Sequence, residues 1–300
     1  MNLNAVPQAE TSWRCAWDAQ CALGEGPVWD VRRAKLWFVD LKGDALLSWS
    51  ETEGGEAFQF TGGPSVVVPI LGADDLLCVS RAGLERWRPE DGARRLVSRF
   101  EHEPPGNRPN DGKCDPSGRL WVGTMDDAEE AFSGTLYRLG PGGAPMAVVG
   151  SVGVSNGLGW SPSGDVFYYT DSLRRRIWRA AFDLASGSLG PLEGFVDVEA
   201  DAGAPDGLAV DSEGFVWSAH WDGWRITRYD PDGAIDRVIP FPGPRPTSLC
   251  FGGSDLRTLY ATSARAGLSD AVLARTRQAG GLFAMESHVA GLPAMPARLA

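Results

Sequence analysis

A short pattern recurs along most of this 300-residue chain. Its clearest copy spans residues 155–164, reads Ser-Asn-Gly-Leu-Gly-Trp-Ser-Pro-Ser-Gly, and is followed at once by an apolar run. The same frame returns at 110–118 and 206–214, and more faintly at 25–30. The first position of the repeat is counted at residue 156 of the clearest copy, and in all four copies it holds an oxygen-bearing side chain. These first positions are Glu25, Asn110, Asn156 and Asp206. Self-similarity of this kind indicates an architecture built from structural repeats.

The spacing of the repeat predicts the fold. Two weaker copies, placed by their Leu-rich second strands, begin at Ser65 and at Thr247 or Ser248. The chain then holds six units, offset by 40 to 50 residues, each with room for about four short strands and no amphipathic helix. This pattern favours an all-β fold, a six-bladed β-propeller, over a sandwich or an open sheet. We expect residues 13–17 to close the ring by pairing with 281–285, which leaves no free edge at the seam.

Composition and charge limit the domain organisation, the classes of binding partner and the cellular location that we expect. We expect residues 1–12 to form a flexible N-terminal tail and 13–300 a single propeller domain, since one closed β-architecture of this length is ordinary. The net charge of −11 argues against nucleic acid and anionic membranes as partners and favours a small polar ligand. No apolar run reaches about 18 residues, and the N-terminus has no signal-peptide pattern. Five scattered cysteines without a CxxC pair indicate reduced thiols. We therefore expect a cytoplasmic protein, and a monomer.

The four first positions predict a metal site. Equivalent positions in propeller blades face the same place, so these side chains are expected to ring the mouth of the central channel. Two carboxylates and two amide oxygens, without sulfur or imidazole, suit calcium, magnesium, manganese or iron(II) more than structural zinc. The alternative is that the Asn-Gly and Asp-Gly pairs simply make turns. Four copies in register, one of them a Glu and thus a poor turn residue, favour the metal site.

Other chemistry-bearing residues are fewer. Arg108 lies two residues before Asn110, and an Arg fork beside a metal can hold a carbonyl or hydroxyl oxygen of a substrate. A surface Arg in a Pro-bounded loop is an equal alternative. Most of the 12 Trp recur at strand positions and are expected to pack between blades. The three His show no spacing typical of ligands or a catalytic triad, and neither a G-x-S-x-G elbow nor a Gly-rich phosphate loop occurs.

Six motifs occur together in one order along the chain. They are Leu-Gly-Glu-Gly-Pro-Val-Trp at 23–29, Asn-Arg-Pro-Asn-Asp-Gly-Lys at 107–113, Gly-Thr-Met at 123–125, Ser-Asn-Gly-Leu at 155–158, Pro-Asp-Gly-Leu at 205–208 and Cys-Phe-Gly-Gly at 250–253. In this combination the chain resembles the senescence marker protein/regucalcin/gluconolactonase family, from about residue 13 to 290. Residues 263–269 and 280–283 look most like the bacterial sugar lactonases of that family, including those that open pentonolactones.

The resemblance implies a six-bladed propeller with one divalent metal at the channel mouth. The metal ligands would be Glu25, Asn156 and Asp206. By the same resemblance, Arg108 and Asn110 would face the substrate. Members of the family often carry an acid at the third residue after Gly-Thr-Met, and this chain departs from that pattern with Ala128. Asp126, Asp127, Glu129 and Glu130 lie close by.

The resulting hypothesis is a metal-dependent hydrolase that opens a sugar aldonolactone, such as xylono-, arabino-, galactono- or gluconolactone, to the free sugar acid. The divalent ion would be calcium, iron(II), manganese, magnesium or zinc, and would act as a Lewis acid on the oxyanion that forms. Asp206 would take the proton from water and return it to the leaving ring hydroxyl. Two alternatives stay open: a non-catalytic calcium-binding regulatory propeller, and a phosphotriesterase-like hydrolase on the same metal site.

Overall fold

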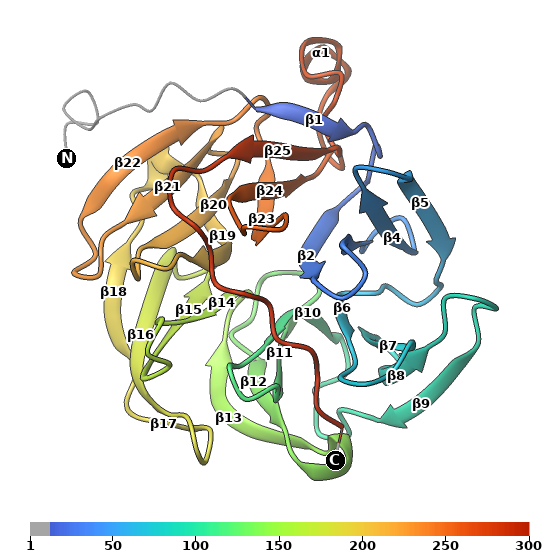
Figure 1. The fold of residues 1–300 in the computed structure, drawn as a ribbon. Helices are drawn as coiled ribbons and strands as arrows, with labels where there is room; N and C mark the ends of the chain where they lie inside the picture. Colours follow the sequence, from blue (N-terminus) through green and yellow to red (C-terminus); the bar gives the residue numbers. More distant parts are fainter. Residues whose placement is uncertain (1–12, 300) are drawn as a thin grey trace.

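The computed structural model describes residues 13–299. These residues form six sheets of antiparallel strands, arranged as blades around a central channel (Figure 1). The predicted six-bladed β-propeller is thereby confirmed. Residues 1–12, for which the sequence predicts a flexible tail, lie outside the described residues. Within 13–299, no helix has the length and hydropathy of a membrane span.

In blades 1 to 5 the strands follow the chain from the channel outward. Blade 1 consists of β2 (Gly24–Asp30), β3 (Lys35–Asp40), β4 (Ala45–Ser50) and β5 (Gly54–Gln59). Blade 2 consists of β6 (Val66–Pro69), β7 (Leu76–Ser80), β8 (Gly83–Trp87) and β9 (Arg94–Ser98). Blade 3 consists of β10 (Asn107–Cys114), β11 (Leu120–Asp126), β12 (Gly134–Leu139) and β13 (Pro145–Val152).

Blade 4 consists of β14 (Ser155–Trp160), β15 (Val166–Asp171), β16 (Arg176–Asp183), the short β17 (Ser188–Leu189) and β18 (Glu193–Asp197). Blade 5 consists of β19 (Ala204–Val210), β20 (Val216–Trp221), β21 (Arg225–Tyr229) and β22 (Ile235–Pro240). Blade 6 consists of β23 (Pro246–Gly252), β24 (Thr258–Ser263), β25 (Leu282–Glu286) and β1 (Arg14–Trp17). The remaining elements are the 3-10 turns η2 (Pro141–Gly143) and η3 (Ala200–Ala202) and the helix α1 (Asp270–Arg275).

The first and last strands of the chain close the ring. β1 pairs antiparallel with β25, so that Arg14 lies opposite Ala284 and Cys15 opposite Phe283. Blade 6 is therefore built from both ends of the chain, as the sequence predicts. The pairing removes two strand edges that would otherwise be free at the seam.

Apolar packing joins every blade to the next. The buried apolar residues form six clusters, and each cluster draws most of its members from two neighbouring blades. Trp121 of blade 3 packs against Trp160 of blade 4 with ring centroids 6.2 Å apart, and Trp217 of blade 5 packs against Phe251 of blade 6 at 5.8 Å. The prediction that recurring Trp residues pack between blades is confirmed. Because the six clusters complete a circle, every blade packs against a neighbouring blade on both of its sides.

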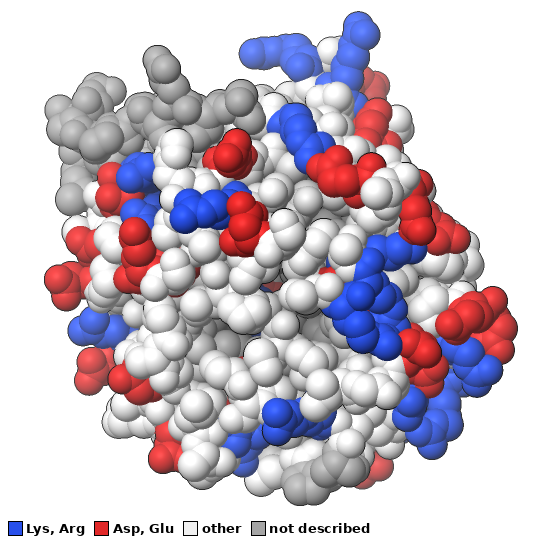
Figure 2. All heavy atoms as spheres, in the orientation of Figure 1, with Lys and Arg blue, Asp and Glu red and all other residues white. Residues whose placement is uncertain are grey.

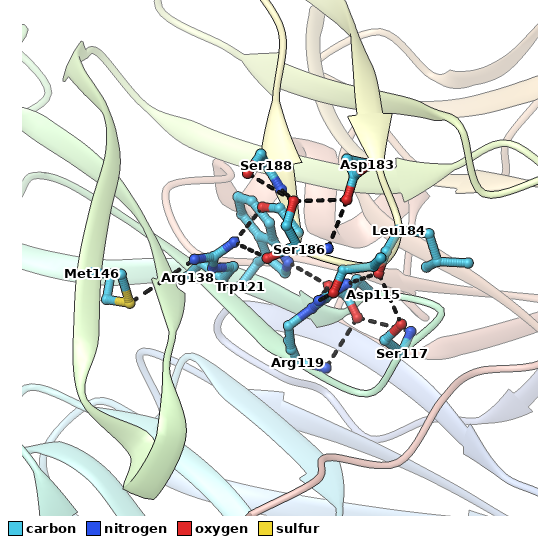
Figure 3. Close-up of polar contacts among 12 residues, drawn as sticks. Asp115, Ser117, Arg119, Trp121, Arg138, Met146, Asp183, Leu184, Ser186 and Ser188 are labelled. Atoms are coloured by element: carbon cyan, nitrogen blue, oxygen red, sulfur yellow. Dashed lines mark hydrogen bonds and ion pairs between the residues drawn. The ribbon is translucent and has the colours of Figure 1, made fainter.

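A buried acid holds the turn after the inner strand of blade 3 (Figure 3). Asp115 accepts hydrogen bonds from the backbone N–H groups of Ser117 and Arg119, at 2.9 and 3.0 Å, and from the Trp121 indole at 3.1 Å. The Arg119 guanidinium binds the same carboxylate at 2.6 Å and also donates to backbone carbonyls at 184–185 of blade 4. One turn is thus tied to its own blade and to the next.

The C-terminal segment, residues 287–299, crosses one end of the channel (Figure 1). Its backbone bonds first to Arg257 and Leu256 of blade 6, then to Ser212 of blade 5, and finally to Pro69 of blade 2 and Gly118 of blade 3. A cavity of about 250 Å³ lies beneath it, lined mostly by apolar side chains. Figure 2 shows this face, with uncharged side chains around the centre and charged ones mostly toward the rim. The segment therefore covers the end of the channel that lies opposite the repeat's first positions.

Candidate active site

A β-bulge marks the first position of the repeat. In five of the six blades the pairing of the inner strand shifts register at this point. A bulge bends the strand and re-aims a side chain, and bulges are common beside active sites. The Asn156-Gly157 and Asp206-Gly207 pairs lie inside β14 and β19. The alternative reading, in which these pairs form turns, is wrong.

The Gly that follows the first position allows neighbouring inner strands to approach each other. A Cβ atom on Gly157 would lie 2.7 Å from the backbone oxygen of Asp206, and one on Gly207 would lie 2.1 Å from Ser248 Oγ. Both distances are shorter than real Cβ contacts, so only Gly fits without a shift. Close approach of the strands brings the first positions of blades 4 and 5 toward one another.

A cavity of about 360 Å³ opens at this end of the channel. All five residues that the sequence predicts for the site line it, namely Glu25, Arg108, Asn110, Asn156 and Asp206. The two carboxylates and Asn156 are each at most 6% exposed. Residues from four blades thus share one small space, although they are far apart in the sequence.

A chain of hydrogen bonds orients the amides. Asn110 Nδ2 donates to Asn156 Oδ1 at 2.9 Å and to the Ser155 carbonyl at 2.8 Å. Asn156 Nδ2 donates to Ser172 Oγ at 2.8 Å, and that hydroxyl donates to the Pro205 carbonyl at 2.5 Å. These contacts assign the amide orientation and link blades 3, 4 and 5. They also place Asn156 Oδ1, the acceptor end of the amide, on the side of Asn110.

The two carboxylates lack the hydrogen-bond donors that a buried acid normally has. Burial raises the pKa of Glu25 to about 8, and the nearby Asp111 adds to the rise. Burial, then Glu25 and then Asp111, raise the pKa of Asp206 well above its usual range. Glu25 Oε2 accepts only the Gly26 N–H, at 3.0 Å, within residues 13–299. Asp206 Oδ1 is buried and has no hydrogen-bond partner there. A buried carboxylate oxygen without a donor is costly unless a cation neutralises it.

The donor set fits a hard divalent cation. Two carboxylates supply the charge, and the third oxygen is the amide oxygen of Asn156. Nowhere in the described chain do three or more His, Cys, Asp or Glu side chains gather as a metal site. The candidate set of Glu25, Asn156 and Asp206 combines two acids with one amide.

Arg108 is the buried cation of the cavity. Its Nε donates to Asp127 Oδ1 at 2.6 Å and its Nη1 donates to Asn110 Oδ1 at 2.6 Å. The alternative of a surface Arg is wrong, because the residue is 5% exposed. Burial lowers its pKa and the Asp127 partner raises it. A guanidinium keeps its charge under such conditions.

Sequence reasoning gave no site role to five further polar or aromatic residues that line the cavity, namely Lys42, Glu129, Ser172, Arg175 and Trp221. Ala128 does not line it, whereas Glu129, one residue further on, does. Glu129 has a left-handed backbone with φ of 61°. The run of acids from 126 to 130 signals a site, but only the backbone shape tells which acid enters it. His220 is fully buried and bonds Ala202 O, and burial lowers its pKa to about 3, so it is a neutral packing residue.

Fold and site together define a β-propeller whose channel mouth is a buried, oxygen-rich cavity. Residues 23–265 match the model of the SMP-30/gluconolactonase/LRE-like region family. The chain therefore belongs to this family, as the sequence motifs predict.

Relatives in this family carry different names. The chain is 32% identical to regucalcin of Gallus gallus over 291 residues, which covers 94% of this chain and 97% of the relative. It is 35% identical over 247 residues to the pentonolactonase XacC of Haloferax volcanii, covering 82% and 83%. It is 30% identical over 281 residues to a putative sugar lactone lactonase, YvrE, of Bacillus subtilis, covering 93% and 96%.

Solved structures agree with the fold. A calcium-binding protein, regucalcin, from Agrobacterium tumefaciens superposes with a TM-score of 0.92 at 29% identity, covering 98% of this chain and 99% of the other. A luciferin-regenerating enzyme superposes with a TM-score of 0.90 at 26% identity, covering 96% and 100%.

Proposed function

We propose that this protein is a metal-dependent hydrolase that opens a sugar aldonolactone to the free sugar acid. The observation that carries the proposal is the buried Asp206 oxygen without a donor, next to Glu25 in a cavity that Arg108 also lines. Relatives named pentonolactonase and sugar lactone lactonase support the reaction class. The cavity volume, about 360 Å³, is sufficient for one pentono- or hexonolactone.

Glu25, Asn156 and Asp206 are proposed to hold one divalent ion, which would be calcium, iron(II), manganese, magnesium or zinc. When bound, the ion supplies Lewis acidity at a substrate or water oxygen. The structural relative titled a calcium-binding protein supports a divalent metal in this fold. Ser172 and Asn110 keep the Asn156 amide in place through its two ends. Partners of this kind are worth about 10–100-fold in metal affinity.

The reaction adds one water across the ring ester. Asp206 takes a proton from water as the new C–O bond forms at the carbonyl carbon. The bond from that carbon to the ring oxygen then breaks, and Asp206 returns the proton to the leaving hydroxyl. The Arg108 guanidinium donates to an oxygen of the lactone and holds the substrate in place in both the ground state and the transition state. The products are a sugar carboxylate, a free hydroxyl and one proton released at neutral pH.

Arg108, Asn110 and Glu129 are proposed to bind the sugar. Within residues 13–299 the Nη2 group of Arg108 has no hydrogen-bond partner, so it is available to an oxygen of the substrate. Family members often carry an acid at the position of Ala128. Here Glu129, which lines the cavity, is proposed to supply that carboxylate. The five free cysteines, all among the described residues, support a reducing compartment and thus a cytoplasmic location. A monomeric state and the lack of nucleic-acid or membrane partners stay predictions.

A lactone panel tests the proposal. Protein stripped by a chelator is reloaded with calcium, magnesium, manganese, zinc or iron(II), and tested on γ- and δ-lactones of xylonate, arabinonate, galactonate and gluconate. Acid release is followed with a pH indicator in weak buffer, and spontaneous opening is subtracted. We expect hydrolysis only with metal, and none in a metal-loaded Glu25→Gln variant.

A calcium-binding regulatory propeller is the second candidate, because several relatives are named regucalcin. The same panel separates the two. A rise in melting temperature with calcium, but no lactone hydrolysis above background with any metal, would reject the enzyme and support the binding protein. Phosphotriesters, run alongside the lactones, test for a phosphotriesterase-like hydrolase.

A further inference from the structure

The loop between β11 and β12, residues 127–133, is tied down at both of its ends. Asp126, the last residue of β11, accepts hydrogen bonds from the N–H groups of Glu130 and Ala131 at 3.1 and 3.0 Å. At the other end of the loop, the guanidinium of Arg174 in blade 4 lies 4.2 Å from the Phe132 ring centroid. Ser133 Oγ donates to Asn107 Oδ1 at 2.8 Å. The loop therefore bridges blade 3 to blade 4 at the edge of the cavity.

Asp127 connects this loop to two arginines. Its Oδ1 accepts Arg108 Nε at 2.6 Å, and its Oδ2 accepts Arg81 Nη2 at 2.7 Å. Arg108 lies in the cavity with 6% of its side chain exposed, whereas Arg81 is 48% exposed in the turn between β7 and β8 of blade 2. The backbone N–H of Asp127 donates to Gly106 O at 3.0 Å. The carboxylate is thus fixed by its own backbone and by one cation on each side.

The guanidinium of Arg108 is held at two of its three nitrogens. Asp127 binds Nε, and Asn110 Oδ1 binds Nη1 at 2.6 Å. Nη2 is the nitrogen without a partner among residues 13–299. A planar fork fixed at two points can present its third point in one direction only. The long Arg108 side chain is therefore ordered before the substrate binds. Binding does not have to supply the entropy cost of ordering it.

We propose that Asp127 is a positioning residue for substrate binding, which aims Nη2 of Arg108 at a substrate oxygen and is itself held in place by Arg81. The inference rests on the proposed function. It makes blade 2, which contributes no residue to the cavity lining, a determinant of affinity through Arg81. A contact that preorganises binding equally in the ground state and the transition state changes KM and leaves kcat unchanged.

The test compares Asp127→Ala, Asp127→Asn and Arg81→Met in the metal-loaded protein. We expect KM for the best lactone to rise about tenfold in Asp127→Ala and about threefold in Arg81→Met, with kcat within about twofold of the wild type. Asp127→Asn keeps one oxygen for Arg108 but loses the charge. Its KM should therefore lie between the KM values of Asp127→Ala and Arg81→Met. Arg86→Met is the matched control, because Arg86 forms a comparable pair with Asp75 at 2.6 Å away from the cavity. Its KM should equal that of the wild type.

A second readout keeps the inference separate from the lactonase proposal. Binding of the sugar acid product is measured by calorimetry, and melting temperatures are recorded for every variant. Weaker binding with an unchanged melting temperature supports the positioning role even if turnover is absent. Wild-type KM and product affinity in Asp127→Ala overturn it, as does a parallel loss of kcat and melting temperature, which indicates a structural role. Failure of the wild type to hydrolyse any lactone rejects the proposed function alone.

Discussion

Two positions of the repeat, five residues apart, are both buried and polar but serve different ends. The first position lies at the channel mouth, and the sixth lies at the turn after the inner strand. In blade 5 they are Asp206 and Asp211, which are 4% and 0% exposed. Asp211 accepts backbone N–H groups from Glu213 and Phe215, the Trp217 indole at 2.8 Å, and two bonds from one guanidinium, that of Arg228.

The difference between the two acids lies in their donors. Asp211 is surrounded by hydrogen-bond donors, whereas Asp206 Oδ1 has none within the described residues and faces other acids. In blade 3 the sixth position, Asp115, is surrounded by donors in the same way as Asp211. Burial of a carboxylate is therefore no sign of function. A buried carboxylate whose oxygens lack hydrogen-bond donors does indicate function, because such a group does not stabilise the fold.

The largest effect should come from the first position. We expect Asp206→Ala to lower turnover by about a thousandfold, because it removes the proposed proton acceptor and a proposed metal ligand. The metal-free variant should unfold at no lower urea concentration than metal-free wild type, since a buried unpaired charge is removed. Steady-state acid release and urea melts measure the two quantities. Full activity in Asp206→Ala contradicts the assignment, and Asp206→Asn controls for shape.

The sixth position should behave in the opposite way. Asp211→Ala leaves the Trp217 indole without its acceptor and removes two bonds to Arg228, so the free energy of unfolding should fall by about 3–5 kcal/mol. Activity per folded molecule should stay within about twofold of the wild type. Glu213→Ala is the matched control: Glu213 is 60% exposed and also binds Arg228, and its loss should cost less than about 1 kcal/mol. A loss of activity in folded Asp211→Ala would remove the distinction between the two positions.

The smallest of the three effects is a pH dependence of the metal-free protein. The pKa of Glu25 is raised in the folded state, to about 8, so folding favours its protonated form. This contribution to stability is full below the ordinary pKa of 4.5 and is lost as the pH rises from there toward 8. Asp206 acts in the same direction. We expect the melting temperature of metal-free protein to fall by roughly 5 °C or more over this range.

Metal-loaded protein provides the comparison for that pH series. A bound cation favours the ionised carboxylates, so the loaded protein should lose less stability between pH 5 and pH 8. The Asp206→Asn variant, metal-free, should show a shallower fall because one of the two acids is gone. Equal slopes for metal-free wild type and the variant would mean that Asp206 does not contribute to the pH dependence.

The sequence reveals much of the site because the repeat is regular. The period predicts six blades, and the shared first position predicts that Glu25, Asn156 and Asp206 converge. The sequence alone does not distinguish a turn from a bulge at Asn156-Gly157, because a bulge is defined by the register with the partner strand. Nor could it choose Glu129 among neighbouring acids, since that choice depends on a left-handed backbone and on the bonds made by Asp126.

Irregular segments were also beyond sequence reasoning. The helix α1 has six residues and none of them is buried, so it leaves no apolar stripe in the sequence. It is not an amphipathic helix. The C-terminal segment from 287 to 299 bonds to four blades through backbone atoms, and backbone bonds of this kind have no side-chain signature.

The pairing of β1 with β25 has a consequence for synthesis on the ribosome. The partner of Arg14 is Ala284, so β1 emerges first and waits for almost the whole chain to be translated. At about 5–20 residues per second, that delay is roughly 15 to 55 seconds. Throughout it, the nascent protein is an open arc whose first-made strand has nothing to pair with. A chaperone that shields such an edge would act at the beginning of this chain.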